Sequence, residues 1–279
     1  MTRQEMEEVL TLVRQALEPR LTQPATIPAT PAPTAALPRT GTVILYRSKN
    51  SDSIVALRDA LTAEGVNVRR VRDLRNVVLV PGDLVVAWGE KVARVPAGVT
   101  VYNAAPLKNK KEEMRALAHA GISVPLFTTT RPTTGAWLKR TSNHQSASDL
   151  RNQAAVTNPA FWVVKAEIAK EFRIHVFGGE SIRSGLKVKA NANAHEWIRS
   201  VETGWKIDYG ARCQAEIRQS YRDAAKAAVR ALGLTFGAVD LGVTPTGGII
   251  VFEVNTAPAL ANPQTAKAYA RRIRAAVRP

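Results

Sequence analysis

Two segments of the sequence decide the fold: residues 170–182, KEFRIHVFGGESI, and residues 236–260, FGAVDLGVTPTGGIIVFEVNTAPAL. In the first, polar and apolar residues alternate from Glu171 to Phe177, and Gly178-Gly179-Glu180 indicates a three-residue turn. In the second, two apolar strands flank the five residues 244–248, which include Pro and two Gly. Both segments are therefore predicted to be β-hairpins.

One face of the first hairpin gathers cations. The three-residue turn places Glu171 opposite Lys187 and His175 opposite Arg183. Several cations with a single acid suit a phosphate or carboxylate ligand. The alternative is a solvated face with ordinary cross-strand ion pairs. The cations expected on this face are Arg173, Arg183, Lys187 and Lys189.

The second hairpin brings two acids together. Asp240 falls opposite residue 252 or 253 and is therefore a neighbour of Glu253. At ~5 Å and an effective dielectric of about 20, the two charges repel by roughly 3 kcal/mol. A shared proton, a basic side chain or a divalent cation can relieve that repulsion. We favour Mg²⁺, with Mn²⁺ as a substitute, because Asn255 adds a third oxygen on the face predicted for Val251 and Glu253.

Together the strings EFRIHV and FEVNTAP resemble the ATP-grasp ligases, and most of all the carboxylate–amine ligase-like ATP-grasp proteins of tailed phages, which are similar to the ribosomal-protein glutamate ligases. The resemblance covers residues 100–279. It implies an ATP-grasp fold and a reaction in which ATP and Mg²⁺ convert a carboxylate into an acyl phosphate, which an amine then converts into an amide, with ADP and phosphate released. A kinase with the same nucleotide site is an alternative.

The resemblance also implies roles for single residues. Asp240, Glu253 and Asn255 would hold the metal, and Arg173 and Lys187 would serve the phosphates, joined by Arg183 from the same predicted face. The family's glycine-rich flap is replaced by SNHQSAS at 142–148, where His144 can donate to a phosphate. This departure, and Ala257-Pro258-Ala259 where the family commonly has Pro-Gly, also fit a relative that only binds nucleotide. The predicted nucleotide-binding residues are Lys110, Lys139, His144, Lys165, Glu167 and Glu171.

Residues 42–104 form a separate pattern. Strands at 42–46, 66–71 and 83–87 alternate with a helix at 53–64, which indicates a small α/β lobe with a parallel sheet. Residues 105–279 are the expected ATP-grasp domain. The predicted fold class is thus α/β, with an α+β ligase part.

The first 41 residues are expected to lie outside this core. Residues 1–18 follow the spacing of an amphipathic helix, which would dock on a partner, self-associate or fray in solvent. Residues 19–41 are rich in Pro, Thr and Ala and predict a disordered linker.

The charge favours an anionic partner. Lys and Arg number 39 against 23 Asp and Glu, a net charge of +16. A polyanionic acceptor, either an acidic peptide or a nucleic acid, would use this charge, whereas the carboxylate and amine substrates leave no pattern. A non-catalytic nucleic-acid-binding protein is the rival class, but only 6% of residues are aromatic, which leaves few stacking platforms.

The location is expected to be cytoplasmic, in the host cell if the protein is phage-encoded. No apolar run approaches the ~18 residues of a membrane span, and no signal peptide is evident. A single cysteine, Cys213, excludes an intrachain disulfide.

Overall fold

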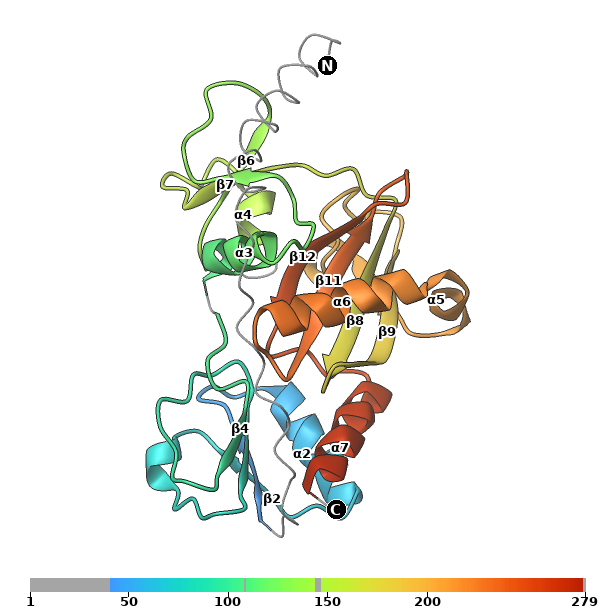
Figure 1. Cartoon of the computed structure of the whole chain (residues 1–279). Helices are drawn as coiled ribbons and strands as arrows, with labels where there is room; N and C mark the ends of the chain where they lie inside the picture. The colour runs from blue at the N-terminus through green and yellow to red at the C-terminus, as the bar shows by residue number, and fades with distance from the viewer. Residues whose placement is uncertain (1–40, 108, 144–146, 278–279) are drawn as a thin grey trace. The chain divides into compact units, whose positions relative to one another are not determined.

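A computed structural model describes residues 41–107, 109–143 and 147–277 (Figure 1). The predicted helix over 1–18, the linker over 19–41 apart from its last residue, and His144 lie outside the described residues. Within the described residues, no helix combines the length and the apolar character that a membrane crossing requires.

The first part of the described chain is the predicted α/β lobe. Its strands are all parallel, in the order β2-β1-β3-β4, which confirms the sequence prediction. Helix α2 ends just before Gly65, whose φ of 71° is costly for other residues. The elements are β1 (Val43–Tyr46), α2 (Asp52–Ala63), β2 (Val68–Val71), the 3-10 turn η2 (Leu74–Asn76), β3 (Leu84–Ala87) and β4 (Thr100–Tyr102).

The C-terminal helix α7 (Pro263–Val277), which the sequence analysis did not identify, completes the core of this lobe. Pro263 occupies its first position, and Asn262 Oδ1 accepts from the amide of Gln264 at 3.0 Å, so the start of the helix is capped. Its apolar stripe, which includes Tyr269 and Ile273, shares one buried cluster with α2 and β1. A lobe of about 60 residues has only a marginal core by itself, and α7 adds apolar surface to that core.

A small antiparallel sheet in the order β5-β7-β6 follows the lobe. Asn109 Oδ1 caps helix α3 by accepting from the amides of Lys111 and Glu112 at 3.0 and 3.3 Å. Phe161 and Val163 pack with Met114 of α3 beneath the sheet. The elements are α3 (Lys110–His119), β5 (Phe127–Thr128), β6 (Trp137–Arg140), α4 (Ser148–Arg151) and β7 (Phe161–Val164).

The large sheet is antiparallel and has the order β10-β9-β8-β11-β12. Helix α6 (Gln219–Ala231), which sequence analysis also missed, covers one face of it (Figure 1), and Tyr221, Ala225 and Val229 pack against Phe172 and Val254. The opposite face carries the polar residues of the strands. The remaining elements are β8 (Lys170–Phe177), β9 (Glu180–Lys189), the 3-10 turn η3 (Val201–Thr203), β10 (Trp205–Asp208), α5 (Ala211–Glu216), β11 (Phe236–Val243) and β12 (Ile249–Asn255).

The first hairpin has a shorter turn than predicted. Phe177 pairs with Glu180, so the turn contains only Gly178 and Gly179, with φ values of 58° and 79°. Two left-handed residues favour a two-residue hairpin loop. A bulge after His175 then shifts the register, and His175 still faces Arg183 as predicted.

The second hairpin has the predicted five-residue loop and pairs Asp240 with Glu253. A bulge between Asp240 and Leu241 breaks the predicted alternation of β12. Because of this extra residue, Val251 packs in the core and does not share a face with Glu253, whereas Phe252 lies with Glu253 on the polar side.

Candidate active site

The polar face of the large sheet and one face of the small sheet line a cavity of about 630 Å³, which we call the central cavity. Strands β8, β9, β11 and β12 supply the charged residues of its floor, and the small sheet supplies apolar residues such as Phe161 and Val163 together with Arg140. The loop before β10 adds Trp197 and Arg199. The cavity therefore combines an apolar wall with a charged floor, as small-molecule sites commonly do.

The charged floor centres on Asp240, which is 5% exposed. Its two oxygens accept from Arg173 Nε at 2.6 Å and Arg173 Nη2 at 2.7 Å, and Lys187 Nζ donates to it at 2.9 Å. Arg173 is the cross-strand partner of Asp240 on β8, so the sheet register itself creates this pair. Lys187 also bonds Glu171. We call Glu171, Arg173, Lys187 and Asp240 the charge cluster.

These contacts set the protonation of the cluster. Burial alone would raise the pKa of Asp240, but Arg173 and Lys187 outweigh it and hold that pKa well below its usual value. Burial raises the pKa of Glu171, and the nearby Lys187 offsets only part of the rise. The cluster thus pairs two cations with two carboxylates, and none of the four side chains is more than 16% exposed.

Glu253 has a different cation partner. Lys110 Nζ of α3 lies 3.1 Å from Glu253 and 3.6 Å from the buried Glu113. Burial raises the pKa of Glu113 to about 7, and its Oε1 accepts from the amide of Val254 at 2.8 Å. The repulsion between Asp240 and Glu253 is thus relieved by basic side chains: Arg173 and Lys187 neutralise Asp240, and Lys110 neutralises Glu253.

The three predicted metal ligands share one cavity. Asp240, Glu253 and Asn255 all line the central cavity. Among the described residues, no group of three or more His, Cys, Asp or Glu could hold a metal ion by itself. Two carboxylates and one amide oxygen nevertheless fit Mg²⁺, which takes few protein ligands when phosphates complete its shell.

Four of the predicted nucleotide-binding residues line the central cavity: Lys110, Lys165, Glu167 and Glu171. Lys165 Nζ lies 5.0 Å from the ring centroid of Trp197. Lys165 and Glu167 come directly after β7, so the small sheet positions them at the cavity.

Lys139, a further predicted nucleotide-binding residue, lies on β6. On β6, Leu138 and Arg140 line the cavity, and Lys139 does not. The reason is alternation: side chains two apart share a face, so Lys139 lies on the other side of the strand. Arg140 occupies the cavity side, and its Nε lies 2.9 Å from Asp149.

The structure places Arg183 apart from Arg173 and Lys187, with which it was predicted to act. Arg183 is not among the residues that line the central cavity, and its guanidinium lies 4.7 Å from the ring centroid of Tyr209. It shares the strand face of Lys187, but four residues separate the two on β9, or roughly 13 Å. Arg183 and Lys187 therefore share a face of β9, but only Lys187 lines the central cavity.

The sequence analysis missed three residues that line the cavity, Arg140, Trp197 and Arg199. It also missed the buried Glu113, which contacts Lys110 and Val254 behind the cavity lining. Arg199 Nη2 donates to the carbonyl of Ile168 at 2.7 Å and so anchors the loop over the cavity. A Trp-Ile-Arg string in an otherwise polar loop was the available signal for Trp197 and Arg199, whereas nothing local distinguishes Glu113.

Comparisons with known proteins point to one fold. The ATP-grasp ligase PsnB, complexed with a minimal precursor, superposes with a TM-score of 0.60 over 84% of this chain and 99% of its own, at 13% sequence identity. D-cycloserine synthetase DcsG matches with a TM-score of 0.57 over 85% and 100% of the two chains, at 14% identity. The chain has the ATP-grasp fold.

The macrocyclase MdnC from Microcystis aeruginosa MRC, bound with precursor peptide MdnA, is a further ATP-grasp structure of this kind, with a TM-score of 0.53, 15% identity, and coverage of 82% of this chain and 98% of its own. No protein-family model and no curated protein matches the sequence. The ATP-grasp fold implied by the two hairpin strings is therefore confirmed by three-dimensional likeness alone.

Proposed function

We propose that the chain is an ATP- and Mg²⁺-dependent ligase that joins a carboxylate to an amine through an acyl phosphate. One observation carries the proposal: the carboxylates Asp240 and Glu253 lie beside three cations in one cavity. Phosphoryl transfer needs charge stabilisation and positioning more than it needs a protein nucleophile. The charge cluster supplies both signs of charge at one place.

The structural neighbours support this chemistry. PsnB has been solved with Mg and ADP, and MdnC with a precursor peptide. By analogy with these neighbours, the proposed cofactors of this chain are ATP and Mg²⁺, and its proposed substrate is of the peptide type. The identity of the acid and of the amine is open to direct assay.

In the proposed site, Asp240, Glu253 and Asn255 hold Mg²⁺, which supplies positive charge to the transferring phosphate when it is bound. Arg173 and Lys187 contact the phosphate oxygens. Since both cations now contact Asp240, the arrival of a phosphate exchanges one anionic partner for another, and the cations are already in position. Lys110, Lys165, Glu167 and Glu171 are the proposed nucleotide contacts, with Arg140 in place of Lys139.

The bond changes then follow. An oxygen of the substrate carboxylate attacks the γ-phosphorus, and the bond from that phosphorus to ADP breaks. The amine nitrogen attacks the carbonyl carbon of the acyl phosphate, the carbon–oxygen bond to phosphate breaks, and the amine proton passes to solvent. The apolar wall around Phe161 and Val163 limits water, which would otherwise hydrolyse the acyl phosphate.

The test is a panel of acids and amines with ATP and Mg²⁺, in which ADP and phosphate are measured and the product is identified by mass spectrometry. We expect an amide, with ADP and phosphate formed in equal amounts. AMP and pyrophosphate would exclude the acyl-phosphate route. A stable phosphorylated product that needs no amine would reassign the protein as a kinase.

A matched pair of lysine variants tests the nucleotide site. Lys110→Met removes a cation that lines the cavity, whereas Lys139→Met removes a cation from the face of β6 that points away from the cavity. We expect nucleotide affinity, measured with a fluorescent ADP analogue, to fall about tenfold or more for Lys110→Met and by less than about twofold for Lys139→Met. Equal losses would overturn the assignment of faces.

A further inference from the structure

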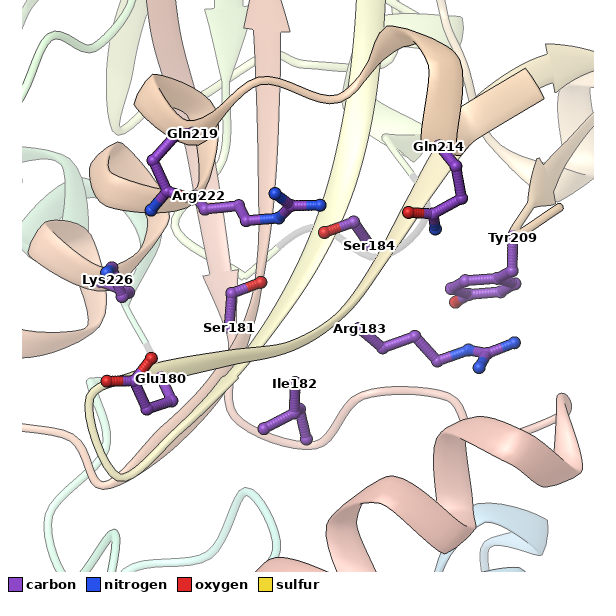
Figure 2. Close-up of a pocket in the computed structure, with 10 residues that line it drawn as sticks. All are labelled: Glu180, Ser181, Ile182, Arg183, Ser184, Tyr209, Gln214, Gln219, Arg222 and Lys226. Carbon is purple, nitrogen blue, oxygen red and sulfur yellow. The ribbon is translucent and has the colours of Figure 1, made fainter. Parts of the chain in front are cut away.

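A second hollow lies at the other end of β9, with a volume of about 430 Å³ (Figure 2). We call it the basic hollow. Three cations and a single carboxylate, Glu180, line it, together with hydroxyl and amide groups. None of these residues lines the central cavity. Its main polar residues are Ser181, Arg183, Gln214, Gln219, Arg222 and Lys226.

The basic hollow surrounds a free strand edge. Strand β10 pairs with β9 only from Leu186 to Lys189, and among the described residues no other strand pairs with the outer edge of β9. Figure 2 shows Arg222 on one side of β9 and Arg183 on the other. The open stretch ends at Ser184, whose carbonyl accepts from Cys213 Sγ of α5 at 3.3 Å.

The two arginines of the hollow are not neutralised. Within the described part of the chain, neither Arg183 nor Arg222 has a carboxylate in salt-bridge range. The Nε of Arg183 is also buried without a hydrogen-bond partner. A buried donor that lacks an acceptor is costly, so a small turn of this guanidinium toward a carboxylate in the hollow would add a hydrogen bond that is now missing. The hollow is therefore complementary to an anion.

The shape and the lining favour a peptide over a nucleic acid. Side chains of an extended peptide point alternately to its two faces, which matches arginines on both sides of β9. Among the described residues of the hollow, the one aromatic ring is that of Tyr209, and the guanidinium of Arg183 already stacks on it at 4.7 Å. No ring is left on which a base could stack.

We propose that the basic hollow binds an acidic peptide segment, which lies along the free edge of β9 and directs carboxylates to Arg222 and Arg183. Arg183 is roughly 13 Å along the strand from Lys187 of the charge cluster, or about four extended residues. The binding step is separate from the ligase chemistry.

The experiment uses the full chain and a fluorescein-labelled oligoglutamate peptide, with binding followed by fluorescence anisotropy at low ionic strength and at about 0.15 M salt. Arg222→Glu places a negative charge in the hollow. Arg230→Glu makes the same change in net charge on the exposed side of the same helix, outside the hollow. We expect peptide affinity to fall about tenfold or more for Arg222→Glu and less than about twofold for Arg230→Glu.

Three results would overturn the proposal: no binding of oligoglutamate, equal losses in both variants, or tighter binding of a single-stranded DNA of equal charge that Arg222→Glu abolishes. Nucleotide binding is measured on the same samples and should be unchanged in both variants. Nucleotide binding without peptide binding would reject this proposal and leave the proposed function standing. Peptide binding without nucleotide binding would support the peptide site and reject the proposed ligase function.

Discussion

Strand β9 carries cations at both ends, and the two ends differ in how those charges are balanced. At Lys187, the cations of the charge cluster contact carboxylates. At Arg183, the basic hollow holds arginines without a carboxylate partner among the described residues. A ligand at the first end must replace existing ion pairs, whereas a ligand at the second adds new ones. The first arrangement suits a step in which charge moves, and the second suits capture of an anion.

The largest expected difference is in stability. Arg173→Met leaves Asp240 buried with only Lys187 as its partner, and breaking a buried ion pair in this way costs about 3–5 kcal/mol of the free energy of unfolding. Urea denaturation followed by circular dichroism measures it. A loss below about 1 kcal/mol is what an exposed salt bridge contributes, and it would mean that the ion pairs at the Lys187 end of β9 do not stabilise the fold.

The next effect is on turnover. Glu253→Gln keeps the size of the side chain but removes one of the two charges proposed to hold Mg²⁺, so ATP-dependent phosphate release should fall roughly 10²–10³-fold. The Mg²⁺ concentration needed for half-maximal activity should rise. Glu180→Gln, the same substitution in the basic hollow, is the matched control and should not lower phosphate release. Similar losses in both variants would show that Glu253 has no special role.

The third effect is on pH dependence and comes from buried groups around the charge cluster. His175 lies between the hydroxyls of Tyr269 and Tyr209, at 3.2 Å from each, and burial lowers its pKa to about 3. The unfolded chain binds a proton there below about pH 6.5 and the folded chain does not, so stability falls as the pH falls from 7 to 5, by about 2 kcal/mol.

Glu113 acts in the opposite direction. Its folded pKa of about 7 lies above the ordinary value of 4.5, so the folded chain takes up a proton first, and stability rises as the pH falls over the same interval. The two contributions largely cancel in the wild type. His175→Gln should therefore become more stable at pH 5 relative to pH 7, and Glu113→Gln less stable. Parallel pH profiles for both variants and the wild type would contradict this assignment.

The smallest expected effect is at the other end of β9. Arg222→Met removes a half-buried cation that has no carboxylate partner among the described residues, so the free energy of unfolding should change by no more than about 0.5 kcal/mol. Thermal and urea unfolding measure it beside Arg173→Met. A loss above about 1.5 kcal/mol would mean that Arg222 stabilises the fold and is not held ready for a ligand.

Local pattern was enough to predict the strands that carry the site. The alternation of residues 171–177 and the glycine-rich loops predicted both hairpins and placed Asp240 beside Glu253, while its partner was left open between residues 252 and 253. The turn of the first hairpin was predicted one residue too long, and a bulge offset the error. Bulges are single-residue events with no periodic signal, which is why the face of Val251 was also predicted wrongly.

What the sequence by itself determined is therefore the two hairpins, the parallel lobe and the two adjacent acids, because these follow from periods of a few residues. The tertiary structure decided which cation meets which acid. Lys110 reaches Glu253 across 143 positions, Lys187 reaches Asp240 across 53, and α7 closes a core begun at Val43. Such contacts depend on how separate elements pack, and packing is set by the whole buried surface, which no short window of sequence contains.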